Sequence, residues 1–312
     1  MLLRLAKKVL SLQPFPRNNH RVIFLYHHIK ATQSNFYLPQ CTTSENNFIE
    51  QINFIRKYFN ILSLEELLAK TEDGKRYASI VFDDGFDSFK NVAFPVLKNY
   101  KIPATVFVNQ AAIEKQQLWV SNILLNADNK NYLEQLWHKF MSEQINFDKF
   151  AKNPLNLMLT QANFNADPSF LYDSNLKFPL KIYLDEQEII DLDKKGIQFE
   201  NHSSDHLVLS LCNLDTQRKQ IIENKLYLEN LLAKTSQHFA IPFGKTEHFN
   251  QDTTQILQNN LYNYSNIPQI FDYQQNSIKN LIPRISLTEE SIPELIFYLN
   301  RATIQSFFEN KL

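Results

Sequence analysis

Acidic, histidine and turn-forming residues gather directly after four apolar segments of the sequence. These polar clusters are Tyr26-His27-His28, Asp83-Asp84-Gly85, residues 201–206 (NHSSDH) and Pro242-Phe243-Gly244. Each apolar segment has the length and composition of a buried β-strand, so each cluster would lie at the carboxyl end of a strand. In parallel α/β folds that end of the sheet carries the active site. The sequence therefore predicts one polar site assembled from four separate segments.

His202 and His206 are four residues apart in the sequence. On a helical turn this spacing places both imidazoles on one face, within reach of one ion. Of the adjacent Asp83 and Asp84, one could bind the same ion while the other faces a water molecule. Two histidines and a carboxylate form an open coordination set for a divalent metal, with positions left for water and substrate. The alternative for the acidic cluster is a turn that caps the following helix, which explains Asp87 but not two acids after a buried strand.

The elements that must position these residues alternate in the manner of a parallel α/β fold. Strands are predicted over residues 21–27, 78–82, 104–108, 197–200, 238–241 and 281–287. Helices are predicted over residues 44–58, 63–70, 88–100, 185–195, 215–234, 251–259 and 289–307. Six or seven such β-α units predict a distorted (β/α) barrel that is closed or nearly closed.

Residues 114–180 interrupt the alternation. This segment is rich in Asn, Gln, Lys and aromatic residues, with helix-like pieces at 119–125 and 132–140. We expect an insertion over one end of the sheet, which acts either as a lid or substrate-binding region or as a structural excursion. The predicted organisation is an N-terminal segment over residues 1–20 and one domain over 21–312 that contains this insertion.

Composition excludes several classes of protein. Only 4 of the 312 residues are glycine, and no two are close, which rules out glycine-rich phosphate loops and flexible Gly/Ser linkers. The net charge of -1 provides no basic surface for nucleic acid, so no nucleic-acid partner is expected. Cys41 and Cys212 are too few for a disulfide framework.

The first residues form a basic, amphipathic pattern. Arg4, Lys7 and Lys8 interrupt the apolar run of residues 2–12, whereas a signal peptide needs an unbroken one. On a helical wheel the leucines of this segment lie opposite its charges, so it could rest on an anionic membrane surface. The alternative is a terminal helix packed on the domain. We therefore expect a cytoplasmic protein, with peripheral contact at the inner membrane surface through residues 2–12 as a further hypothesis.

Three motifs in this order resemble the polysaccharide deacetylase family, also known as NodB-homology proteins or carbohydrate esterase family 4. The family motif T-F-D-D-G is similar to residues 81–85 (VFDDG), H-[ST]-x-x-H to residues 202–206 (HSSDH), and R-x-P-[YF] in part to residues 240–243 (AIPF). Residues 101–108 (KIPATVFV) and the early LYHHI at 25–29 also resemble this family. The resemblance covers roughly residues 21–110 and 182–290.

The resemblance implies a role for each matched residue. Asp84, His202 and His206 would hold a divalent metal ion, with zinc the first choice. Asp83 would be the general base that takes a proton from the metal-bound water. The backbone N–H of Phe243 would help to stabilise the tetrahedral oxyanion.

The sequence departs from the family pattern at two points. Ala240 stands where the third motif has an arginine that orients the catalytic aspartate, and Arg284 is our candidate replacement, with a surface salt bridge as the alternative. The late histidine that acts as general acid in the family is missing, since no histidine follows His248. We expect His27 to take this role rather than His28, because alternation along the strand directs only one of them inward.

The expected function is metal-dependent hydrolysis of an N-acetyl group on a sugar of a glycan or lipid-linked glycan precursor. The alternatives are a deformylase or another amidohydrolase on the same fold, and a carbohydrate-binding member without catalysis. Trp119 and Trp137 could stack on sugar rings, although core packing is the commoner role of a single aromatic residue. His138 and His248 are expected at the surface.

Overall fold

The computed structural model describes residues 21–34, 36–38, 40–71, 73–165, 168–172, 181–257, 262–265 and 281–309. The N-terminal segment over residues 1–20 lies outside this part of the chain, so its predicted amphipathic helix stays a prediction. None of the described helices is both long and apolar enough to cross a lipid bilayer.

Nine strands of the described residues form one parallel sheet. Its order is β10-β9-β8-β7-β6-β5-β1-β11, and the short β4 pairs with β5 outside this order. The strands are β1 (Arg21–Tyr26), β4 (Asn60–Ile61), β5 (Tyr77–Phe82), β6 (Ala104–Val108), β7 (Gln198–Asn201), β8 (His238–Ala240), β9 (Tyr262–Ser265), β10 (Leu281–Pro283) and β11 (Ile285–Ser286). A separate parallel pair joins β2 (His28–Lys30) to β3 (Thr42–Ser44).

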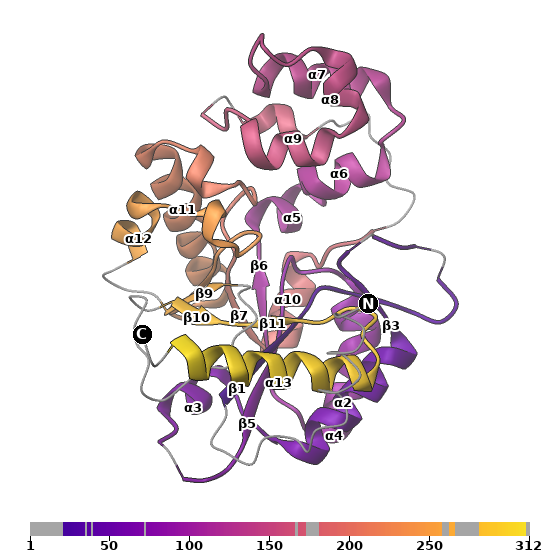
Figure 1. Ribbon diagram of the computed structural model, residues 1–312, viewed down its shortest axis with the longest axis vertical. Helices are drawn as coiled ribbons and strands as arrows, with labels where there is room; N and C mark the ends of the chain where they lie inside the picture. The colour runs from indigo at the N-terminus through magenta and orange to yellow at the C-terminus, as the bar shows by residue number, and fades with distance from the viewer. Residues whose placement is uncertain are drawn as a thin grey trace.

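Helices connect the strands and cover the outside of the sheet (Figure 1). They are α2 (Glu45–Tyr58), α3 (Leu64–Ala69), α4 (Phe94–Tyr100), α5 (Gln110–Lys115), α10 (Glu186–Asp193), α11 (Leu214–Leu232), α12 (Gln251–Leu257) and α13 (Ile292–Glu309). The capping box predicted at Ser63 is present, because the Ser63 hydroxyl accepts from the Glu66 N–H and the Glu66 carboxylate from the Ser63 N–H. A π-helical turn, Phe89–Ala93, precedes α4, and Pro95 occupies the first turn of α4, where its missing N–H leaves no gap.

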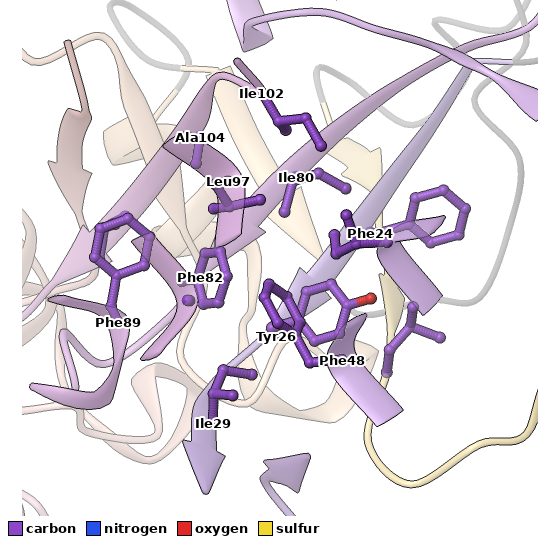
Figure 2. Close-up of a cluster of buried hydrophobic side chains, with 14 of the residues drawn as sticks. Phe24, Tyr26, Ile29, Phe48, Ile80, Phe82, Phe89, Leu97, Ile102 and Ala104 are labelled. Atoms are coloured by element: carbon purple, nitrogen blue, oxygen red, sulfur yellow. The ribbon is translucent and has the colours of Figure 1, made fainter. Parts of the chain in front are cut away.

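Alternate residues of each strand face two different apolar cores. In β1, Phe24 packs with the core outside the sheet, a cluster that Figure 2 draws and that also contains Tyr26 and Phe82. Ile23 and Leu25 belong instead to a smaller cluster inside the sheet, together with residues of β5, β6 and β8. A side chain just beyond the end of a strand therefore points inward or outward according to this two-residue period.

The two edges of the sheet are formed by segments that are adjacent in the sequence. β10 pairs with β9 at one edge, whereas β11 pairs with β1 at the other. Only Arg284 separates these strands, and its side chain is fully buried. The sheet thus curls until its edges meet at Arg284, which gives the distorted (β/α) barrel that the sequence predicted. The single strand predicted over 281–287 is wrong, because the two halves of that run pair with different neighbours.

Four further helices follow α5 and gather at one end of the molecule, beyond the end of β6 (Figure 1). They are α6 (Trp119–Leu125), α7 (Lys130–Phe140), α8 (Phe147–Lys152) and α9 (Pro154–Gln161). Their apolar faces form a core of their own around Leu136, Phe150 and Met158. Both helical pieces predicted in the insertion are present. The division of the chain into domains stays a prediction.

Gly85 occupies the tight turn after Asp83 and Asp84. At this turn the chain that follows β5 passes close to the end of β6. Its φ of +68° lies in the left-handed region, and a Cβ on it would come within 2.9 Å of Val108 Cγ1. Gly196 has a similar backbone, with φ of +90°, but no atom lies within 4 Å of its added Cβ. The two glycines therefore separate backbone strain from steric clash.

We predict that Gly85→Ala destabilises the protein more than Gly196→Ala does. The Gly196 variant should lose only the backbone term, about 1–2 kcal/mol, whereas the Gly85 variant adds the clash with Val108. Urea denaturation of both variants and the wild type would measure the free energies of unfolding. Equal losses would show that Val108 moves aside freely and that the turn is not closely packed.

Candidate active site

Asp83 lies at the carboxyl end of β5 and points into the barrel. Its carboxylate receives two hydrogen bonds from Arg284, at 2.8 Å from Nη1 to Oδ1 and 2.7 Å from Nη2 to Oδ2. Both side chains are buried, with 1% and 0% of their surface exposed. Burial alone would raise the pKa of Asp83, but the charge of Arg284 holds the pKa below its usual range. Arg284 thus occupies the place of the arginine missing at Ala240, and the surface alternative for it is wrong.

Asp84 faces two histidines across a narrow gap. Its Oδ1 lies 3.3 Å from His206 Nε2 and 3.5 Å from His202 Nε2, and the three ligand atoms lie within 4.8 Å of one another. Burial, and then the neighbouring Asp83 charge, raise the pKa of Asp84 to about 8. Burial lowers the pKa of both histidines. Burial thus favours the uncharged form of all three side chains.

The orientation of the triad suits a metal ion. Among the described residues no hydrogen-bond partner reaches Asp84 Oδ1 or His206 Nδ1, although both atoms are buried. His202 Nδ1 lies 2.8 Å from the Ala240 carbonyl and must donate to it, so the lone pair of Nε2 faces Asp84. A buried carboxylate oxygen without a partner, aimed at two imidazole nitrogens, is the donor set that a divalent cation would complete.

The segments that carry these residues have strained backbones. Asp84, Ser203, His206 and Phe243 all have φ between +55° and +69°, a region that residues other than glycine rarely occupy. For Asp84 this left-handed turn departs from the strand geometry of Phe82 and lets the carboxylate face the histidines. Such strain persists only where the surroundings hold the backbone.

Neighbouring side chains hold the histidine loop in place. Asn109 Nδ2 donates to the carbonyls of His202 and Ser203, and the Ser203 hydroxyl accepts from the His206 N–H. The Trp119 indole N–H donates to the His206 carbonyl at 3.0 Å. Trp119 is fully buried, so its role is packing and positioning rather than stacking on a sugar.

The structure separates the two adjacent histidines as the strand alternation predicts. His27 has the same parity as Leu25 and lines the cavity beside Asp83. Burial lowers the pKa of His27 to about 4, against the opposing effect of Asp83. His28 lies on β2, where its Nδ1 is 3.0 Å from the Ser88 hydroxyl and its ring packs on Phe36.

A cavity of about 400 Å³ opens beside the triad. Phe243 lines it with its ring 4.5 Å from that of His206. Six of the seven residues selected from the sequence thus line the cavity, and the seventh, Arg284, is bonded to one of them, Asp83. His248 is buried and lines the same cavity, so the expectation that it lies at the surface is wrong, whereas His138 is exposed as expected. In the sequence, His248 lies only four residues after Gly244, which was the one indication that it belongs near the site. The structure shows that the short turn between them folds back so that His248 packs on Phe243.

A second group of possible ligands lies outside the cavity lining. Glu65, Glu200 and His238 bring their ligand atoms within 4.8 Å of one another. Glu200 Oε2 already accepts from the Ser236 hydroxyl and from two backbone N–H groups, and Gln198 donates to Glu65 and to Glu200 Oε1. Because these carboxylate oxygens already accept hydrogen bonds, we interpret the group as a hydrogen-bonded network and not as a metal site.

A parallel barrel with paired acids and histidines at the carboxyl ends of its strands defines an enzyme of the α/β-barrel class. The family model for polysaccharide deacetylase matches residues 70–265, and the chain belongs to this family. The members that it resembles are carbohydrate N-deacetylases, which are hydrolases that act on amides.

Individual relatives are distant. A poly-β-1,6-N-acetyl-D-glucosamine N-deacetylase of Staphylococcus aureus is 28% identical over 144 residues, or 44% of this chain, and the chain spans about half (49%) of that relative. The Streptococcus pyogenes deacetylase PplD has a TM-score of 0.59 at 18% identity, over 92% of this chain and 98% of PplD. IcaB from Ammonifex degensii has a TM-score of 0.59 at 14% identity, over 91% and 98%. These structures confirm the fold.

The burial of His28 leads to a prediction about how the stability of the protein depends on pH. Burial lowers the pKa of His28 to about 4, so between pH 6.5 and 4 the unfolded chain binds a proton there that the folded chain does not. Stability must then fall as the pH falls through this window. His28→Asn keeps an acceptor near Ser88 but does not titrate. Between pH 7 and 5 we expect the wild type to lose about 2 kcal/mol more stability than this variant.

Denaturant unfolding of both proteins at several pH values provides the measurement. His28→Asn should also keep its catalytic turnover, since His28 lies outside the cavity. Parallel pH profiles for the two proteins would contradict the assignment of a neutral, buried His28.

Proposed function

We propose that this protein removes the N-acetyl group from an amino sugar of a glycan, with a divalent metal ion held by Asp84, His202 and His206. The observation that carries the proposal is the convergence of this triad with an ionised acid, Asp83, in one cavity. The names of the relatives support an N-acetylglucosamine polymer as the substrate class. Zinc is the ion we favour, because two histidines and one carboxylate form a common catalytic zinc set.

The ion would polarise the amide carbonyl and lower the pKa of a water molecule next to it. The protein supplies the proton transfers. Asp83 stays ionised because Arg284 pairs with it, so it can accept a proton from the attacking water. Arg284 also fixes both carboxylate oxygens of Asp83, and the acid cannot rotate away from the cavity.

The leaving amine must gain a proton, and His27 is the residue placed to donate it. Its ring lines the cavity near Asp83, whose negative charge favours the protonated imidazole although burial disfavours it. The backbone N–H of Phe243 would donate to the oxygen that becomes negative when water adds to the carbonyl. Its left-handed φ of +61° belongs to the turn that carries Phe243, whose ring packs against that of His206.

Two aspects of the proposal concern the cell and not the site. Residues 2–12 would rest on an anionic membrane surface, and the enzyme would act in the cytoplasm on a glycan precursor. The basic and apolar pattern of this segment supports both ideas. Removal of residues 2–12 should then lower the fraction of protein that sediments with anionic vesicles.

The first test of the function is Asp83→Asn. We expect release of free amine from β-1,6-linked N-acetylglucosamine oligomers by the zinc-loaded protein to fall about 10²–10⁴-fold, because the variant lacks the general base. Zinc content should stay near one ion per chain, since Asp83 is not among the three proposed ligands. Asp87→Asn is the matched control, an acid of the same turn that does not line the cavity.

The outcomes separate the candidate functions. Full activity of the Asp83 variant would contradict the role of this acid. Bound zinc without amine release by the wild type, from any acylated sugar, would favour a carbohydrate-binding protein without catalysis.

A second test concerns the pairing of Asp83 with Arg284. Arg284→Gln removes the charge that lowers the pKa of Asp83, so this pKa should rise. The base must be ionised to act, and the acidic limb of the rate profile against pH should therefore move to higher pH. Arg284→Lys keeps the charge but not the bidentate geometry, and its limb should move less. Loss of the partner of a buried charge should also cost about 3–5 kcal/mol of stability, measured by denaturation.

An unshifted limb in Arg284→Gln, with the variant folded, would show that Asp83 does not set the acidic limb. Rates are compared well below the unfolding temperature of each variant, so that loss of folded protein does not imitate a pH effect.

A further inference from the structure

The cavity beside the triad has two chemically different sides. One side is built by α6 and α9 and presents the aliphatic side chains of Val120, Leu124, Leu155 and Leu159. All four are half-buried, so each keeps part of its surface open to the cavity. The other side comes from β11 and loops of the barrel and carries the polar side chains of Gln40, Lys245, His248 and Ser286, together with the apolar Leu38 and Phe86.

The described residues of the aliphatic side offer few hydrogen bonds to a sugar. Ser121 is the polar residue of the described insertion that lines the cavity, and its hydroxyl is already bonded to the Tyr183 hydroxyl at 2.6 Å. A sugar hydroxyl placed against these helices would lose its water without replacement, which is unfavourable. Hydrocarbon placed there would instead be removed from water, which is favourable.

Each side of the cavity lies next to different residues of the candidate active site. These neighbours decide which part of a substrate that side would bind. Val120 directly follows Trp119, whose indole N–H donates to the His206 carbonyl and whose ring lies 5.9 Å from that of Phe243. The aliphatic side therefore begins next to the residues that would hold the amide carbonyl. His27, which would protonate the amine, follows β1 and lines the cavity from the barrel, away from the helices of the insertion.

We infer that the aliphatic side binds the hydrocarbon tail of an N-acyl group longer than acetyl, while the sugar occupies the polar side. The inference rests on the amide hydrolysis of the proposed function and replaces its acetyl group by a longer acyl group. In the reaction water supplies the oxygen of the new C–O bond, the C–N bond of the amide breaks, and the nitrogen gains a proton. The products are the free amino sugar and a carboxylate with a chain of four or more carbons.

The experiment compares N-acetyl-, N-butanoyl-, N-hexanoyl- and N-octanoyl-glucosamine as substrates of the zinc-loaded protein. Burial of each added methylene should raise kcat/KM about threefold until the cavity is filled, at least as far as hexanoyl. A preference for acetyl, with rates that fall as the chain lengthens, would overturn the inference while the proposed deacetylase function stands.

Two adjacent leucines of α6 provide matched variants. Leu124 lines the cavity, whereas Leu125 does not and is 37% exposed. Leu124→Ser should lower the ratio of hexanoyl to acetyl kcat/KM about tenfold, and Leu125→Ser should leave this ratio unchanged. Equal effects of the two substitutions would overturn the inference.

A binding measurement tests the aliphatic subsite even if the protein turns over none of these sugars. Calorimetry with zinc-loaded Asp83→Asn compares the affinities of N-hexanoyl- and N-acetylglucosamine. Tighter binding of the hexanoyl sugar supports the aliphatic subsite even if the proposed function fails. Equal or weaker binding overturns the subsite whether or not turnover is seen.

Discussion

The buried ion pair between Asp83 and Arg284 is the interaction on which the site and the barrel both depend. Burial of an isolated carboxylate is so unfavourable that the group would normally take up a proton. The bidentate contact, with both distances below 3 Å, keeps the carboxylate charged. Arg284 is also the residue at which β10 ends and β11 begins, so the same side chain lies where the two edges of the sheet meet. Closure of the barrel and ionisation of the acid thus rest on one contact.

This pair also explains why two adjacent acids behave differently. Asp83 has its pKa lowered by Arg284, whereas Asp84 has its pKa raised by burial and by the charge of Asp83 itself. Neighbouring carboxylates whose pKa values are pushed apart commonly have different tasks in a site. Asp83 suits proton transfer because it is ionised and fixed. Asp84 suits a cation, because a positive charge would remove the reason for its raised pKa.

The sequence predicted the fold and the site where the signal was local. The period of two along β1 was enough to direct His27 inward and His28 outward, and the motif spacing was enough to bring His202 and His206 together. Arg284 was a candidate because the third motif lacks its arginine and Arg284 lies on a late predicted strand, but the sequence left a surface salt bridge open as the alternative. The sequence could not show that the run 281–287 belongs to both edges of the sheet, because pairing partners are chosen over long distances in the chain. His248 was missed for a different reason, because the sequence does not show that the short turn after Gly244 folds back over Phe243.

The helical insertion contributes residues to the candidate active site, so it is more than a structural excursion from the barrel. Its helix α6 begins with Trp119, which holds the carbonyl of a proposed metal ligand, and continues with Val120 and Leu124, which face the cavity. The strained backbone of His206 needs such support, because a left-handed conformation costs about 1–2 kcal/mol for a residue with a side chain. A shift of α6 would therefore move the ligand loop and the cavity wall together. In the proposed function, the geometry of the metal centre and the choice of acyl group would thus depend on the same helix, and substitutions in its core should change both.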